Sequence, residues 1–414
     1  MRAINSLIRI ITRQNQNVKI SFVFKSLYGF SQGIFLVIYN LYLIELDIPL
    51  DMIGMVLSAN PLALAVGSIP VGYLTEIIGF KKSFLLIYGI SGISLLAQIF
   101  ISRVELMMIA AFICGLALSG DFVANMTFLA HNTTEDDRTK IYSYSSLFFN
   151  LFISIGSLIA VILPNILINL ELSILIVYRL TLLISGGLLV AASLLGMKIS
   201  QNLYNQEQQV DFKPYFQGID TFTVKQIITL LCLGISLGLL TPFMNLYFIY
   251  HLGSDREFFG TISSLNVFFI SFAIIVGPLI VIKWRSVPVV TTVRLIFVSF
   301  LVIFTWTDHL MIGAIAYWIM MSLFQMSQPI SLGFAIRAST KRHMTAVISW
   351  INVAFWLGYA IAAPVVGFFM FQSRYRYPLF IAIITMLLAS SFNQVFFDKI
   401  EKTFKTKKDI STVL

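Results

Sequence analysis

Long apolar runs separated by short polar stretches fill almost the whole of this chain. A run of about 20 largely apolar residues is long enough to cross the hydrocarbon core of a bilayer as a helix. The first six such runs lie near residues 20–45, 51–75, 82–101, 105–130, 141–166 and 177–197. The second six lie near residues 225–250, 257–282, 287–306, 309–336, 343–371 and 377–397. The pattern therefore predicts an all-α membrane protein with twelve transmembrane helices.

The twelve runs form two blocks of six, because the same short pattern opens each block. The stretches at 29–46 and 234–252 both contain a Gly, a second Gly four residues later and Asn-Leu-Tyr seven residues after that. The matched residues are Gly29, Gly33 and Asn40 in the first stretch and Gly234, Gly238 and Asn245 in the second. Since each block crosses the membrane six times, the repeat is parallel and its axis lies along the membrane normal. A binding site is expected between two such halves, near the midplane.

The polar stretches complete the predicted domain organisation. The five segments are a cytoplasmic N-terminal segment at 1–19, a six-helix half at 20–199, a cytoplasmic linker at 200–224, a second six-helix half at 225–398 and a cytoplasmic basic tail at 399–414.

Composition and charge agree with this organisation. The chain has 414 residues, of which 58% are hydrophobic and 11% charged, too few charges for the surface of a soluble protein of this size. Most of the 28 Lys and Arg residues fall in the loops and termini of one side, which predicts that both termini are cytoplasmic. The net charge of +9 is explained by these loops and needs no nucleic-acid partner. No metal-ligand spacing, phosphate loop or catalytic triad is present, so we expect neither an enzyme nor a cofactor.

The loop between the second and third spans reads "GYLTEIIGFKK". Its glycines permit tight turns and close helix approach, and its acidic residue can accept hydrogen bonds from a helix N-terminus or pair with a cation. This stretch resembles the signature loop of the major facilitator superfamily, Gly-x-Leu-x-Asp-x-x-Gly-Arg-Lys. Glu76 stands where the family has Asp, and Lys82 adds a charge directly after the motif lysine, Lys81. The residues that carry the resemblance and its charge are Gly72, Leu74, Glu76, Gly79, Lys81 and Lys82.

The resemblance implies a two-half transporter fold that works by alternating access, with this loop as an inner gate. An alternative is that Lys81 and Lys82 only set the topology. Proton-coupled drug exporters of the family often carry an Arg in the fourth span, where this chain has Ala111. They also carry a Gly-Pro motif in the fifth span, where this chain has only Gly156 and a late Pro164. Both departures weaken the drug–proton antiporter interpretation.

Charged residues inside spans are costly and indicate function by default. Asp121 lies well inside the fourth span, and Asn125 follows one turn later on the same face. We expect both to face a central cavity, where Asp121 binds a cationic substrate, carries a coupling proton or binds a cation. The alternative is a structural carboxylate. Lys25 and Arg294 are also intramembrane; Lys25 is expected to extend toward the inner surface, and Arg294 to do the same or to pair with a carboxylate.

Amides and tryptophans complete the candidate site. Gln325 and Gln328 share a face of the tenth span, at the position that corresponds to Asp121. The repeated Asn40 and Asn245 either line the site or tie helices together. In the eleventh span, Asn352 and Trp356 are candidates for lining the site, with packing as the alternative for the tryptophan.

These observations predict a secondary transporter in a bacterial cytoplasmic membrane, driven by an ion or substrate gradient and acting as a monomer among membrane lipids. Its expected partners are a small-molecule substrate and a coupling proton or cation. The paucity of buried charge favours export of a lipophilic or weakly cationic compound. Uptake of a small neutral metabolite is the alternative in the same class. A sensor or lipid scramblase with the same fold is the alternative in another class.

Overall fold

The computed structural model describes residues 15–133, 135–199, 219–281, 284–338 and 344–411, and every element in these ranges is helical. The first half contains α2 (Gln16–Ile44), α3 (Leu50–Gly67), α4 (Pro70–Ile78), α5 (Phe80–Phe100), α6 (Val104–Asn132), α7 (Glu135–Ile168) and α8 (Ile174–Gly196). The second half contains α9 (Thr221–Leu240), α10 (Met244–Leu246), the π-helix η2 (Tyr247–His251), α11 (Arg256–Val281), α12 (Ser286–Trp306), α13 (Leu310–Ala338), α14 (Met344–Phe371) and α15 (Tyr377–Ser411). Most of the predicted N-terminal segment and of the predicted linker lies outside the described residues.

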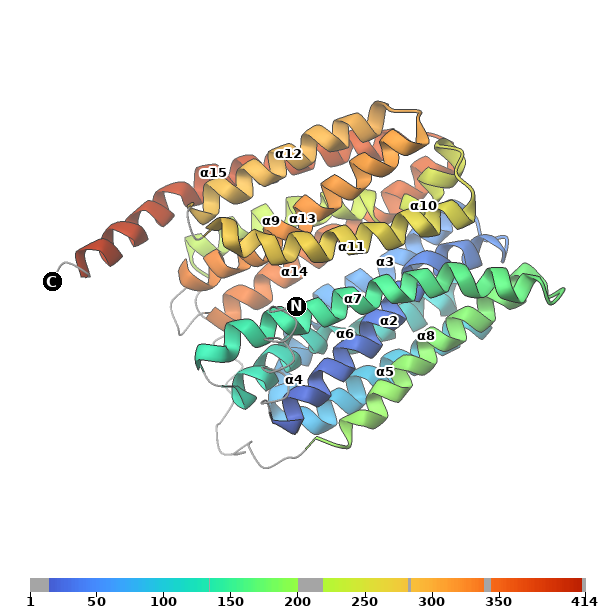
Figure 1. Cartoon of the computed structure of the whole chain (residues 1–414), viewed down its shortest axis with the longest axis horizontal. Coiled ribbons are helices and arrows are strands. Elements are labelled where there is room, and N and C mark those ends of the chain that lie inside the picture. Colours follow the sequence, from blue (N-terminus) through green and yellow to red (C-terminus); the bar gives the residue numbers. More distant parts are fainter. Residues whose placement is uncertain (1–14, 134, 200–218, 282–283, 339–343, 412–414) are drawn as a thin grey trace, which may run out of the picture.

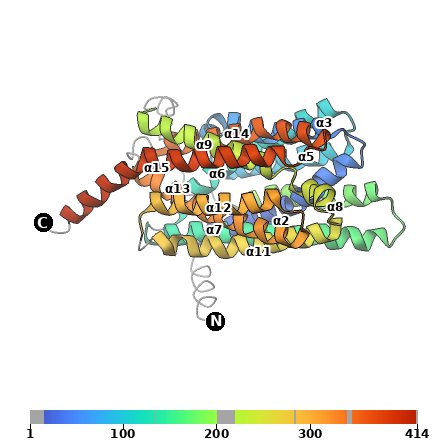
Figure 2. The ribbon, with the colours of Figure 1, turned by 90° about the horizontal axis from the view of Figure 1, so that it is seen from above.

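The two halves lie side by side, with the first half (blue to green) below the second half (yellow to red) in Figure 1. In the view from above, the helices of both halves run along a common long axis, and α15 projects beyond the bundle (Figure 2). Within the described residues, eleven helices are long and apolar enough to cross a membrane. The twelfth is α11, whose described apolar stretch, Phe258–Ile270, is shorter. The predicted arrangement of twelve membrane helices in two halves is thus confirmed.

Two of the predicted spans are interrupted where the sequence was expected to give continuous helices. In the second span, α3 ends at Gly67, and the short α4 begins at Pro70. In the seventh span, α9 ends at Leu240 and the chain resumes a helical course after Pro242. Proline lacks a backbone N–H and its ring collides with the preceding turn, so a helix interior breaks there. The second break leaves the carbonyl oxygen of Pro242 available to another helix.

The sequence repeat is also a structural repeat. In the first half, α2 packs on α7 so closely that a Cβ atom at Gly29 would overlap the carbonyl oxygen of Phe149. In the second half, α9 packs on α14, and a Cβ atom at Gly234 would overlap the carbonyl oxygen of Phe355. The repeated glycines are therefore the surfaces by which the first span of each half contacts the fifth.

The halves meet along two helix pairs, α3 with α14 and α7 with α11. Gly54, near the start of α3, lies against Ala363 and Gly367 on α14. In the other pair, the Ser154 hydroxyl donates a hydrogen bond to the Ser264 carbonyl at 3.2 Å. We call the face at which α2 begins the terminal face, and the face at which α2 ends the opposite face. The Gly54 contact therefore lies toward the opposite face.

The signature loop joins α4 to α5 through Gly79, whose backbone has φ 79° and ψ 158°. This conformation is essentially restricted to glycine, which is the physical reason for a glycine at this place in the motif. Gly72 is buried on α4, Leu74 is exposed, and Lys82 is exposed at the start of α5. The side chain of Glu76 lies outside the described part of the structure.

Candidate substrate site

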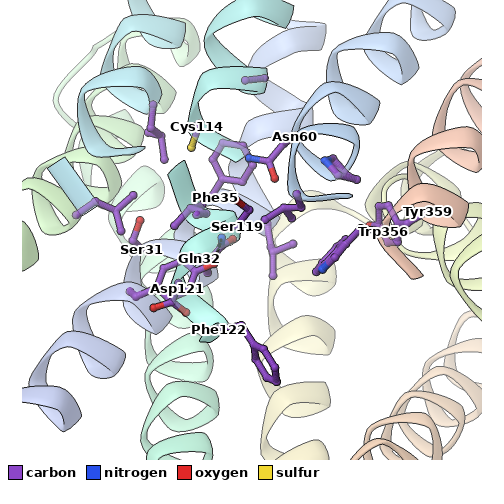
Figure 3. A pocket seen from close by; sticks show the side chains of 18 of the residues that line it. Ser31, Gln32, Phe35, Asn60, Cys114, Ser119, Asp121, Phe122, Trp356 and Tyr359 are labelled. Atoms are coloured by element: carbon purple, nitrogen blue, oxygen red, sulfur yellow. Dashed lines mark hydrogen bonds between the residues drawn. The ribbon is translucent and has the colours of Figure 1, made fainter. Parts of the chain in front are cut away.

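A cavity of about 460 Å³ lies between the two halves, and most of its lining residues belong to the first half. It is lined mainly by α2, α3, α6 and α7. The second half contributes Thr241, Pro242, Asn352, Trp356 and Tyr359. Figure 3 shows Asp121, Ser31 and Gln32 on one side of the cavity and Trp356 and Tyr359 on the other. The charged groups of the cavity therefore come from the first half, whereas aromatic rings come from both halves, with Trp356 and Tyr359 forming the aromatic wall of the second half.

The charged centre of this cavity is an ion pair between the Lys25 ammonium and the Asp121 carboxylate. The Tyr88 hydroxyl donates a second hydrogen bond to Asp121, at 2.6 Å. The Lys25 nitrogen also lies 5.5 Å from the ring centroid of Tyr28 and 5.6 Å from that of Phe149, where cation–π attraction adds to the pairing. Both charged side chains are largely buried, with 14% of Lys25 and 8% of Asp121 exposed.

The expectation that Lys25 extends to the inner surface is therefore wrong. The side chain points into the protein because Asp121 supplies a counter-charge inside the membrane, where a paired charge is far less costly than an unpaired one. The signal was present in the sequence as two opposite intramembrane charges in the same half. Only the packing of the helices showed that these two charges meet.

Asn125 is buried one turn beyond Asp121 and accepts a hydrogen bond from the Ser21 hydroxyl at 3.2 Å. Its side-chain nitrogen has no hydrogen-bond partner in the described part of the chain. Asn125 is not among the residues that line the cavity, whereas Asp121 is. Asn125 therefore ties α6 to α2 beneath the ion pair.

The two repeated asparagines meet each other. The Asn40 amide donates to the side-chain oxygen of Asn245 at 3.1 Å and also to the carbonyl oxygen of Pro242 at the break after α9. Asn40 lines the cavity, and Asn245 is not among its lining residues. Asn40 thus combines both roles considered for it, lining the cavity and tying the first span of one half to the seventh span of the other.

Asn352 and Trp356 bring α14 to the cavity. The Asn352 amide donates to the Ser68 hydroxyl at 3.0 Å, which links the second half to the break between α3 and α4. Trp356 contacts the rings of Phe355 and Tyr359, at centroid distances of 5.2 and 5.7 Å. The aromatic wall is therefore a packed cluster with one face on the cavity.

Gln325 and Gln328 are half-buried on α13, and none of the described residues of α13 lines the cavity. The side-chain nitrogen of Gln328 has no hydrogen-bond partner among the described residues. The correspondence with Asp121 along the sequence does not bring these amides to the same cavity in this conformation.

Several polar residues of the cavity were not singled out from the sequence. Gln32 donates to the Tyr28 hydroxyl at 3.3 Å, and the Tyr39 hydroxyl donates to Gln98 at 2.6 Å. A periodic signal existed, because Lys25, Tyr28, Gln32 and Tyr39 recur at spacings of three, four and seven along the first span. Residues at such spacings share one face of a helix.

Comparison with known proteins agrees with this geometry. The sequence matches the Major Facilitator Superfamily over residues 22–211 and 227–412, one match for each half. No curated protein matches the sequence.

Several solved structures share the fold. A crystal structure of a mutant of the nucleoside transporter NupG has a TM-score of 0.75 at 13% identity, over 92% of this chain and 100% of the other. A bacterial homologue of the human lysosomal transporter Spinster, inward-facing and unoccupied, has a TM-score of 0.74 at 11% identity, over 94% and 97%. A D-xylose–proton symporter has a TM-score of 0.70 at 12% identity, over 91% and 96%. With a match across both halves, this chain belongs to the major facilitator superfamily.

Proposed function

We propose that this protein is a secondary transporter that carries a small molecule across the membrane by alternating access. The observation that supports this most directly is the Lys25–Asp121 ion pair on the wall of a cavity between two repeat-related halves. A purely structural ion pair has no need of a cavity large enough for a small molecule. An ion pair exposed to such a cavity can instead respond to a substrate or a proton.

The ion pair suggests how binding is coupled to movement. A proton added to Asp121, or a cation bound by its carboxylate, removes the partner of Lys25 and leaves an ammonium in a mostly apolar site. Losing one partner of a buried pair costs about 3–5 kcal/mol, which is enough to shift an equilibrium between two conformations. We therefore propose Asp121 as the coupling site and Lys25 as the group that senses its charge.

The lining favours an uncharged or weakly cationic molecule with aromatic or lipophilic character. Lys25 already compensates Asp121, so a fixed cation must displace the lysine, whereas a neutral molecule need not. The Gln32 amide and the Thr241 hydroxyl offer hydrogen bonds, and Trp356 offers a stacking surface. The compensation of Asp121 by Lys25 therefore favours a neutral substrate, transported in either direction. This is a second candidate in addition to the export of a weakly cationic compound that the sequence predicts.

Orientation follows from charge. Lys81, Arg285 and Lys402 lie at the terminal face, and we propose that this face is cytoplasmic in a bacterial inner membrane. The pairing of Asn40 with Asn245 and the contact of Gly54 with Gly367 lie toward the opposite face. These contacts support a state closed on the outside.

The test begins with binding. Wild-type protein, Asp121→Asn and Lys25→Gln are purified in detergent and heated with neutral amphiphiles, lipophilic cations, sugars and amino acids at two pH values. Asp308→Asn, at the opposite face and away from the cavity, is the matched control. A compound that stabilises wild type and the control but neither cavity variant supports the site. Compounds that stabilise all four proteins equally contradict it.

Flux then separates the function classes. The compound selected by binding is loaded into liposomes that contain the protein, and its movement is followed with and without a pH gradient. Substrate flux in liposomes supports the transporter, and its dependence on the orientation of the gradient gives the direction. Movement of labelled lipid without substrate flux indicates a scramblase. Binding without any movement indicates a sensor.

A further inference from the structure

A second intramembrane cation lies in the second half, and the described structure gives it no partner. Arg294 is on α12 and is 1% exposed. None of its three guanidinium nitrogens has a hydrogen-bond partner in the part of the chain that the structure describes. Leaving a buried cation without a counter-charge is among the most costly arrangements in a protein, which points to a ligand.

The repeat shows what is missing beside Arg294. Helices α5 and α12 both contain 21 residues, and α6 and α13 both contain 29. Tyr88 and Arg294 are each the ninth residue of their helix, and Asp121 and Ser327 are each the eighteenth. Arg294 therefore takes the place of the residue that hydrogen-bonds Asp121, and Ser327 takes the place of Asp121 itself.

The helix contacts support this correspondence. In the first half, α5 packs on α6, and a Cβ atom at Gly120 would lie 3.2 Å from Ile87. In the second half, α12 packs on α13, and the equivalent residues Met326 and Val293 belong to one buried cluster. The neighbours of Arg294 and Ser327 thus lie in the α12–α13 interface, as the neighbours of Tyr88 and Asp121 lie in the α5–α6 interface, and from this correspondence Arg294 is expected to face the Ser327 turn of α13.

Among the described side chains, α13 and α15, the helices that pack most extensively on α12, do not supply the missing carboxylate. No Asp or Glu occurs on α13. On α15, Asp398 pairs with Arg285 and Lys402. Glu401 accepts hydrogen bonds from the first two backbone N–H groups of α12, at 2.6 and 2.9 Å. Both carboxylates are therefore occupied near the terminal face.

We propose that Arg294 is a buried anion-binding residue of the second half and that its ligand is the carboxylate of a small molecule, which takes the place that Asp121 has in the first half. The planar guanidinium fork matches a carboxylate through two parallel hydrogen bonds. The ligand is either a free small carboxylate or a carboxylate carried by a larger molecule. Carboxylate binding at Arg294 does not depend on a coupling role of the Lys25–Asp121 pair.

The experiment measures Tm of the purified full-length chain against increasing acetate, benzoate and benzamide at constant ionic strength. Benzamide is the neutral isostere of benzoate. The expected result is a saturable rise of roughly 2–5 °C with a carboxylate and none with benzamide. Acetate and benzoate acting alike indicates a free small carboxylate, and benzoate acting alone indicates a carboxylate on a larger molecule. Arg294→Gln is expected to lose the rise, and Arg294→Lys to keep a smaller one.

A second pair of variants protects the test against misfolding of Arg294→Gln. Ser327→Asp restores the carboxylate that the repeat predicts, with Ser327→Asn as its neutral control. We expect Ser327→Asp to melt several degrees above Ser327→Asn and to lose its response to carboxylates. The proposal is overturned if wild type does not respond to either carboxylate, if benzamide acts as benzoate does, or if Ser327→Asp and Ser327→Asn behave alike.

Discussion

Lys25 and Asp121, on the first and fourth spans, form an ion pair inside the membrane and on the wall of the central cavity. The Tyr88 hydroxyl, on the third span, holds the same carboxylate. Three of the six spans of the first half thus converge on one charged group. A change in the charge of Asp121 therefore alters its interactions with two other helices at once.

Removal of either charge of this pair is expected to destabilise the protein more than removal of both. Lys25→Met or Asp121→Asn leaves an unpaired buried charge, whereas the double variant leaves none. A double-mutant cycle on Tm or on resistance to denaturant should give a coupling energy of roughly 1–3 kcal/mol. Additive effects of the two substitutions would contradict the pairing.

The signature-loop glycine is expected to tolerate no side chain. Gly79→Ala places a Cβ atom on a backbone conformation that costs a non-glycine residue about 1–3 kcal/mol. We expect a lower Tm in detergent. Gly187→Ala on α8 is the matched control, because a Cβ atom there meets no atom within 4 Å. Equal effects of the two substitutions would show that the loop conformation is not what requires the glycine.

The repeated glycines are expected to fail in the same way in both halves. Gly29→Ala and Gly234→Ala each push a methyl group into a backbone carbonyl of the fifth helix of their half. Each should lower Tm by several degrees, as measured by intrinsic fluorescence. Gly333→Ala on α13, where a Cβ atom meets open space, should change Tm little. A larger loss in the control than in the other two would refute the packing role.

His251 at the opposite face is expected to make stability depend on pH. Burial lowers the pKa of this imidazole below its usual value, nearby Arg376 lowers it further, and Asp308 opposes them. Because the folded protein binds the proton less readily than the unfolded chain, stability is present above the unfolded pKa and is lost as pH falls. Tm measured from about pH 7.5 down to about pH 5 should decline. In His251→Gln the decline should be shallower; an unchanged slope would exclude His251 as the cause.

The twelve spans, the two halves and the family follow from the sequence because they depend on local properties. The length of an apolar run, the side on which basic loops gather and the spacing of Gly and Asn in the repeat can each be read within a short window. The breaks at Ser68 and after Leu240 did not follow from the sequence, because proline is tolerated in many membrane helices and only the packing decides where a helix is interrupted.

The sequence by itself thus determined which residues are out of place in a membrane, including Lys25, Asp121 and Arg294, because the cost of burying a charge depends on residue type and depth. Only the tertiary structure decided their partners. It joined Lys25 to Asp121 and Asn40 to Asn245, and it left Arg294 without a partner among the described residues. Pairing depends on helix rotation and register across distant segments, which are set by the packing of the whole bundle and by no local stretch of the chain.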